Sequence, residues 1–318
     1  MAANIKDVAK RAGVSSAAVS YVLNGRLDQL SAPTIERIRT AIAELDYEPS
    51  AMARGLVKQR SGVLGVLGSH LRHPVESFIV SALVVAARKH EMNILIWDRV
   101  DHQTTDPLYI TDQIRQLIAQ RADGVLTSIR LADEHLARLA NAGVPTVVYD
   151  SVFPKVDNVH SDFDLGAELA IAHLAAQERR RLVYLGWNYQ VVAQGVERAL
   201  AAHPEIRLVE RLPDCANPLH ACRQIASLIA RGTAFDAVFA VSDWLASGVY
   251  RACEAAGLAI PRDVAVVGFD DTFAGFFSPP LTSISQSFDQ IAEQAVRRLL
   301  ERIDAPARLR TELVRGAP

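Results

Sequence analysis

The sequence predicts a small all-α head followed by an α/β body of two doubly wound parallel-sheet subdomains. Up to about residue 57 the apolar residues recur in short helical patterns, whereas from residue 62 apolar strands alternate with amphipathic helices. The length of 318 residues suits two or three packed units. Half of the residues are hydrophobic and 22% are charged, as in an ordinary soluble globular protein.

Three short helices are expected in the head, residues 1–48. Gly13 should end the first helix, Ser15 is a good N-cap for the second, and Ser31 caps a third helix with Pro33 in its first turn. The apolar positions expected to share one core are Ile5, Val8, Ala9, Ala12, Val19, Val22, Leu23, Ile35, Ile38, Ile42 and Leu45.

Residues 49–61 are expected to form a hinge helix and a linker. Pro49 and Ser50 favour a helix start, but only about seven residues precede the polar run at 58–62. A helix of this length is marginal in water, so it should fold only when something binds it.

The body, residues 62–318, is expected to contain parallel sheets covered on both faces. Near-continuous apolar segments predict strands at 62–68, 93–97, 123–127, 145–149, 181–186, 237–241 and 264–269. Amphipathic stretches separate these segments. We assign residues 62–159 and 287–303 to a first subdomain, and residues 160–286 and 304–318 to a second.

The charge is unevenly distributed. Residues 1–60 carry nine Lys/Arg and six Asp/Glu, although the whole chain has a net charge of −2. A basic head on an acidic body suits a polyanion engaged by the head alone. Three cysteines without zinc spacing, and the absence of a signal peptide or an apolar spanning run, lead us to expect a cytoplasmic protein with no membrane partner.

Catalysis and metal binding find little support in the sequence. It has no nucleophile elbow, phosphate-binding loop or zinc-protease motif, so we expect neither an enzyme nor a cofactor. His70, His73 and Glu76 could ligate a metal, but a loop histidine pair more often contacts solvent or ligand, and no metal is expected.

The run IKDVAKRAGVSSAAVSYVLNG is a helix, a tight Gly-Val corner and a second helix, which together make a helix-turn-helix. It closely resembles the lactose-repressor (LacI/GalR) family of bacterial transcription regulators. The segment LSAPTIERIRTAIAELDYEPSAMARGL resembles that family's third helix and hinge helix. VPTVVYD, FAVSDWLASG, AGLAIPRDVAVVGFDD and PPLTSISQ resemble its periplasmic-binding-protein-like effector domain, so the resemblance covers nearly the whole chain.

The resemblance implies that the second helix enters the major groove of double-stranded DNA. Ser16, Ala17 and Tyr21 would then read base edges. In the family a hinge leucine wedges the minor groove, and Leu56 falls on that position. The alternative is that these are solvated helix formers and a linker leucine. The expected DNA contacts are Lys6, Ser15, Ser16, Ala17, Ser20, Tyr21, Asn24, Ala53, Arg54 and Leu56.

A small-molecule effector would bind beyond the carboxyl ends of the strands. The expected contacts are Ser69, His73, Asp98, Ser128, Asp150, Trp187, Asp243 and Asp270. Carboxylates facing a cleft suit the hydroxyls of a sugar or the amines of a base, although each could instead cap a helix or bond the backbone. The family's Arg-x-x-Gly clamp reads Val192-Ala193-Gln194-Gly195 here, and Cys215 occupies the position of a frequent aromatic platform.

We therefore expect a repressor that binds a pseudo-palindromic operator as a homodimer and responds to a sugar or related metabolite. The apolar helix at 76–90 suits burial against a partner subunit. The alternatives are a repressor that responds to no effector and a cytoplasmic solute-binding module.

Overall fold

The computed structural model describes residues 3–48, 60–98, 107–186, 190–213, 215–305 and 311–314. The chain divides into two compact units, one of Met1–Val63 with Arg121–Asp123 and one of the remaining residues. They are the expected helical head and α/β body. No helix among the described residues is both long enough and apolar enough to cross a bilayer.

The head consists of short helices joined by tight turns: α1 (Ile5–Ala12), α2 (Ser16–Leu23), a 3-10 turn (Leu27–Gln29) and α3 (Ala32–Glu44). Gly13 ends α1 at φ +65°, a left-handed conformation that glycine adopts without a steric cost. Ser15 caps α2 by accepting a hydrogen bond from the amide of Ala18 at 3.2 Å. The helix-turn-helix therefore follows from local signals in the sequence.

A miniature core holds these helices together. Val8, Val19 and Ile38 supply one fully buried side chain from each of the three α-helices. An ion pair between Arg11 and Glu44, 2.6 Å apart, joins α1 to α3 at the surface. Because the inner residues of α2 pack in this core, the outer face of α2 is exposed to other contacts.

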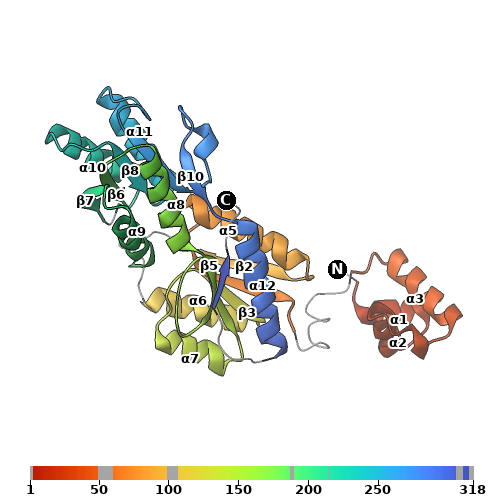
Figure 1. The fold of residues 1–318 in the computed structure, drawn as a ribbon. Helices are drawn as coiled ribbons and strands as arrows, with labels where there is room; N and C mark the ends of the chain where they lie inside the picture. The colour runs from red at the N-terminus through yellow and green to blue at the C-terminus, as the bar shows by residue number, and fades with distance from the viewer. Residues whose placement is uncertain are drawn as a thin grey trace. The chain divides into compact units, whose positions relative to one another are not determined.

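A six-stranded sheet in the order β11-β5-β4-β3-β1-β2 forms the first half of the body. Its strands are β1 (Val63–Ser69), β2 (Asn93–Asp98), β3 (Gly124–Thr127), β4 (Thr146–Tyr149), β5 (Asp157–Ser161) and β11 (Thr311–Val314). Its helices are α5 (Pro74–Arg88), α6 (Pro107–Ala119), α7 (Asp133–Asn141) and α12 (Phe288–Asp304). Helix α12 lies beside α5 and packs against β3, β4 and β5 (Figure 1).

A five-stranded parallel sheet in the order β10-β9-β8-β6-β7 forms the second half. Its strands are β6 (Arg181–Leu185), β7 (Arg207–Leu212), β8 (Ala237–Ala240), β9 (Ala265–Asp270) and β10 (Thr282–Ser285). Its helices are α8 (Phe163–Ala176), α9 (Gln190–Ala202), α10 (Pro218–Ala230) and α11 (Asp243–Ala255), which pack pairwise as α8 with α9 and α10 with α11.

Two sequence expectations about the body need correction. Strands β5, β7, β10 and β11 were not expected, because their sequences are polar or charged. Residues 304–318 were expected in the second subdomain, but β11 pairs in parallel with β5, with Thr311 opposite Asn158. The chain leaves α12 on the first sheet and adds a strand to the edge that β5 presents.

Candidate functional site

The outer face of α2 presents the expected base-reading residues. Ala17 and Tyr21 are exposed and Ser16 is half-buried, whereas Ala18 and Val19 are buried in the head's core. The exposed side of the helix therefore offers a methyl group, a hydroxyl and a phenol. These are groups that can meet a thymine methyl or a base edge in a major groove.

Some of the other expected DNA contacts have roles within the head. The Asn24 side-chain amide donates to the Ser20 carbonyl at 2.8 Å and lies 3.1 Å from its hydroxyl, which fixes the end of α2. Ser15 caps the same helix and stays exposed, and Lys6 is exposed in the first turn of α1. Ala53, Arg54 and Leu56 lie outside the described residues.

In the body, carboxyl groups from both sheets come together at the carboxyl ends of their strands. Asp150 follows β4 of the first sheet and Asp270 ends β9 of the second. The charge on Asp150 contributes to the raised pKa of Asp270, so the two side chains are electrostatic neighbours. Both backbones have positive φ, +50° at Asp150 and +97° at Asp270, and such conformations cluster at functional sites.

Asp150 lies in an acidic environment. Burial, and secondarily the charge on Glu76 in the first turn of α5, raise the pKa of Asp150 to about 8. The hydroxyl of the fully buried Tyr149 donates to Glu76 at 3.2 Å. Atom Oδ1 of Asp150 is buried without a hydrogen-bond partner.

Asp270 is held by a hydrogen-bonded relay. The Gln286 amide donates to Oδ1 of Asp270 at 2.6 Å, and the Ser161 hydroxyl donates to the Gln286 carbonyl oxygen at 2.6 Å. Asp270 is only 4% exposed, and its Oδ2 is buried without a hydrogen-bond partner. Burial raises the pKa of Asp270 well above its usual range, the Gln286 bond opposes this shift, and the charges of Asp150 and Asp243 add to it.

Two other expected contacts serve mainly to hold loops. Asp243 is fully buried, and its carboxylate accepts from the Ser283 hydroxyl at 2.5 Å and from the Phe273 amide at 3.1 Å. Asp98 accepts from the Leu71 amide at 3.0 Å through its side chain. These bonds match the structural alternative considered for such aspartates.

The remaining expected contacts lie at helix and strand ends or outside the described residues. His73, at the N-cap position of α5, meets Trp244 of α11 edge to face with ring centres 5.0 Å apart. Ser128 follows β3 and is half-buried. Ser69 ends β1, but its side chain is outside the description, as is Trp187 entirely.

The sequence reasoning missed several polar residues of this cleft. Gln286 was within the quoted PPLTSISQ segment without an assigned role, and Ser161 ends a strand that the sequence did not reveal. The sequence indicates Glu76 only as a possible metal ligand. The described residues contain no group of three or more side chains that could hold a metal ion.

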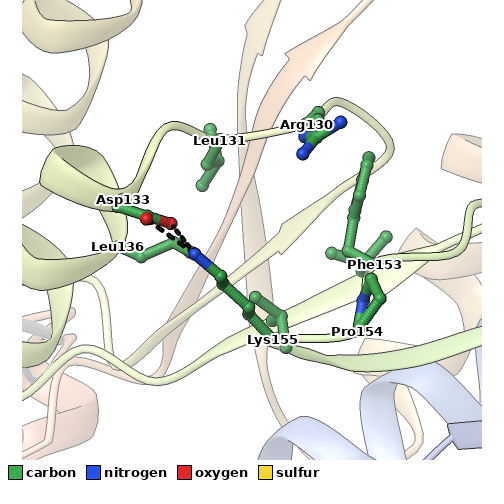
Figure 2. A pocket seen from close by; sticks show the side chains of 9 residues that line it. Arg130, Leu131, Asp133, Leu136, Phe153, Pro154 and Lys155 are labelled. Atoms are coloured by element: carbon green, nitrogen blue, oxygen red, sulfur yellow. Dashed lines mark hydrogen bonds and ion pairs between the residues drawn. The ribbon is translucent and has the colours of Figure 1, made fainter.

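A separate pocket of about 170 Å³ lies in the first subdomain (Figure 2). Its apolar lining includes Leu136 and Phe153, and Lys155 forms an ion pair with Asp133 at 2.6 Å across it. None of the expected site residues lines this pocket, so it is separate from the site at Asp150 and Asp270.

Comparison with known families finds matches in both parts of the chain. Residues 4–50 match the bacterial regulatory proteins of the lacI family, and residues 171–317 match the periplasmic binding protein-like domain. The HTH-type transcriptional repressor PurR of Vibrio vulnificus is 30% identical over 317 residues, covering 95% of this chain and 92% of the relative. The ribose operon repressor of Haemophilus influenzae is 31% identical over 323 residues, covering 96% and 93%.

Solved structures show the same architecture. A lac repressor dimer bound to operator and the anti-inducer ONPF is 26% identical with a TM-score of 0.88, covering 99% of this chain and 97% of that one. The transcriptional regulator CelR in complex with cellobiose is 27% identical with a TM-score of 0.71, covering 98% and 97%.

Proposed function

The chain belongs to the lacI family of bacterial regulatory proteins, and from this we propose that it represses transcription as an effector-responsive dimer on a pseudo-palindromic operator. The observation that carries the proposal is the helix-turn-helix, with α2 anchored by its inner face and exposed on its outer face. In such a motif the second helix lies in the major groove, and two heads read two half-sites.

Operator selection from random DNA tests this readout. We expect an enriched palindromic sequence, and we expect Tyr21→Phe and Ala17→Ser to change the preferred bases within each half-site. Ala43→Ser, at an exposed position of α3, serves as the matched control and should select the same sequence as the parent. If the parent enriches no sequence, the proposed function is wrong.

The dimer proposal is supported by apolar side chains left exposed on the body. Several large ones are more than one-third exposed, and Phe78 of α5 packs against Phe273 at 6.0 Å between ring centres. Exposed apolar side chains of this kind are candidates for burial against a partner. They are Phe78 and Val85 on α5, Leu95 and Ile96 on β2, and Phe273 and Phe276 after β9.

Val85→Glu tests the dimer. Val85 is 57% exposed, so the glutamate is tolerated in a monomer, but a charge buried in an interface would oppose association. We expect sedimentation to show a monomer with an unchanged circular dichroism spectrum and weakened operator binding. An unchanged dimer would place the interface elsewhere.

The hinge supplies a second DNA contact in this proposal, with Leu56 wedged into the minor groove at the operator centre. Leu56→Ala should then weaken binding to the selected operator far more than binding to random DNA. Equal losses of affinity for the two DNAs in a titration would show that Leu56 does not act as a wedge.

The cleft holds the effector in this proposal, a sugar or related metabolite. The relatives' names and the cellobiose complex favour small metabolites, and Asp150 and Asp270 supply acceptors for a polar ligand. An effector acts only through different affinities for the two conformational states. Thermal unfolding against metabolite panels tests binding, because a ligand stabilises the state that it binds.

A further inference from the structure

The pocket of about 170 Å³ in the first subdomain has no role in the proposed function (Figure 2). It lies near the carboxyl ends of β3 and β4, between the segment that leads into α7 and the loop that joins β4 to β5. Every residue that lines it belongs to these neighbouring segments of the first half of the body. A ligand bound here would therefore occupy a site of its own, apart from the site at Asp150 and Asp270.

The walls of this pocket are apolar. Leu131, Val148 and Val156 are buried, and Leu136 and Phe153 are half-buried. An apolar cavity of about 150 Å³ holds one molecule of benzene, so the volume of 170 Å³ suits a single ring and excludes a disaccharide or a nucleotide. The lining contains no hydroxyl or amide side chain that would bind the hydroxyls of a sugar, whereas Phe153 offers an aromatic ligand a ring to pack against.

Three charged side chains also line the pocket, and two of them neutralise each other. The Lys155 ammonium donates to both carboxylate oxygens of Asp133, at 2.8 and 2.6 Å. Arg130 is exposed, and within the described part of the chain its guanidinium has neither an ion pair nor a hydrogen bond. The pocket therefore presents one unpaired positive charge beside its apolar walls. A guanidinium binds a carboxylate through two parallel hydrogen bonds, which sets both the charge and the shape of the group that it prefers.

We propose that this pocket binds a small aromatic carboxylate, with the ring among the apolar side chains and the carboxylate on Arg130. The proposal adds a second ligand site to the proposed function and does not depend on that function. A neutral ring fills the walls but leaves the guanidinium without a partner. A short aliphatic acid pairs with the guanidinium but leaves the walls in water. A ligand that carries both groups uses the whole pocket, and benzoate is the simplest such molecule.

Titration calorimetry of the full chain with benzoate, benzamide and acetate tests the chemistry, with the ionic strength held constant by sodium chloride. Benzamide keeps the ring and the shape without the charge, and acetate keeps the charge without the ring. We expect benzoate to bind at least about tenfold more tightly than either, because a charge-assisted hydrogen bond and the burial of a ring both add to its affinity. No binding of benzoate, or binding no tighter than that of benzamide or acetate, would overturn the proposal.

Arg130→Gln locates the contact. Affinity for benzoate should fall about tenfold, and the preference for benzoate over benzamide should disappear, because glutamine is polar but carries no charge. Arg138→Gln is the matched control, since Arg138 is an exposed arginine of α7 that does not line the pocket. It should bind benzoate as the parent does. Both positions are exposed, so circular dichroism should show the parent's fold in each variant.

An affinity for benzoate that is unchanged by Arg130→Gln, or lowered equally by Arg138→Gln, would place the ligand elsewhere and refute the proposal. The pocket could instead receive a side chain of another protein chain. In that case no anion binds, and Arg130→Gln changes the sedimentation coefficient of the protein. This result would also overturn the proposal, and sedimentation of the parent and of both variants detects it.

Discussion

The charge on Asp150 should destabilise the ligand-free protein, and Asp150→Asn should relieve this. The substitution replaces one carboxylate oxygen by an amide and preserves shape. Asparagine accepts the φ of +50° at this position as readily as aspartate, so backbone strain is not altered. The change therefore isolates the cost of placing a carboxylate beside Glu76 in a buried setting.

The magnitude follows from the pKa of this carboxyl, which burial and Glu76 raise from 3.8 to about 8. A full shift of this size corresponds to an upper limit of roughly 6 kcal/mol at about 1.4 kcal/mol per unit. Local relaxation and water entry reduce such penalties, so we expect a gain of about 2 kcal/mol above pH 8. This corresponds to a rise in Tm of about 5 °C.

The sign of the pH dependence is fixed by linkage. The folded state keeps its proton up to about pH 8, whereas the unfolded chain loses it near pH 3.8. The stability that this raised pKa confers is complete below pH 3.8 and is lost as the pH rises to about 8. The free energy of unfolding of the parent should therefore decrease relative to that of the variant as the pH rises from 3.8 to about 8. Above pH 8 the difference between the two proteins should be constant.

Thermal unfolding of both proteins at pH 5, 7 and 9 measures this difference. Asp271→Asn is the matched control, because Asp271 also has positive φ, at +54°, but is exposed. The Tm of this control should equal that of the parent at every pH. A variant of Asp150 that is less stable than the parent at pH 9, or a Tm difference independent of pH, would refute the reasoning.

Three further predictions concern packing and ion pairing. Arg302→Ala should lower the free energy of unfolding in urea by about 3–5 kcal/mol, because it removes the ion pair of the buried Asp157. Arg297→Ala removes an exposed ion pair and should lower it by at most about 1 kcal/mol. Ile38→Ala should cost the head about 2–5 kcal/mol and abolish operator binding in a gel-shift assay, with the body's Tm unchanged. Gly248→Ala should lower the body's Tm by several degrees, because a Cβ there would overlap the backbone of α10; an unchanged Tm would contradict that packing.

The elements that the sequence predicted are those whose signals are local. A glycine in the left-handed region and a serine cap set the corner between α1 and α2 without help from distant residues. Strand β5 shows the opposite case. Its sequence DNVHS is polar, yet all five residues are buried, because Asp157 pairs with Arg302 and the Asn158 amide bonds to two carbonyls of its own loop. The partner of Asp157 comes from a distant helix, so the sequence of β5 alone does not reveal why this polar strand is buried.

The same distinction applies to the cleft. A position just after an apolar strand predicted Asp150, Asp98 and Asp243 with equal weight. In the structure Asp243 accepts hydrogen bonds from a serine hydroxyl and a backbone amide of neighbouring segments, and Asp98 accepts one from the amide of Leu71. Asp150, in contrast, keeps a buried oxygen without a hydrogen-bond partner. Which carboxylates remain for a ligand depends on which loop amides the fold brings near, and sequence spacing does not record this.

The relay from Asp270 gives the cleft a physical link to the motion that the proposed function requires. Gln286 lies between β10 of the second sheet and α12 on the first, and its amide joins Asp270 of β9 to Ser161 of β5. A ligand group that bonds to Oδ2 of Asp270 polarises the carboxyl group that accepts from Gln286, and so changes the strength of a bond between the two halves of the body. A ligand can shift the balance between conformations only through such a difference.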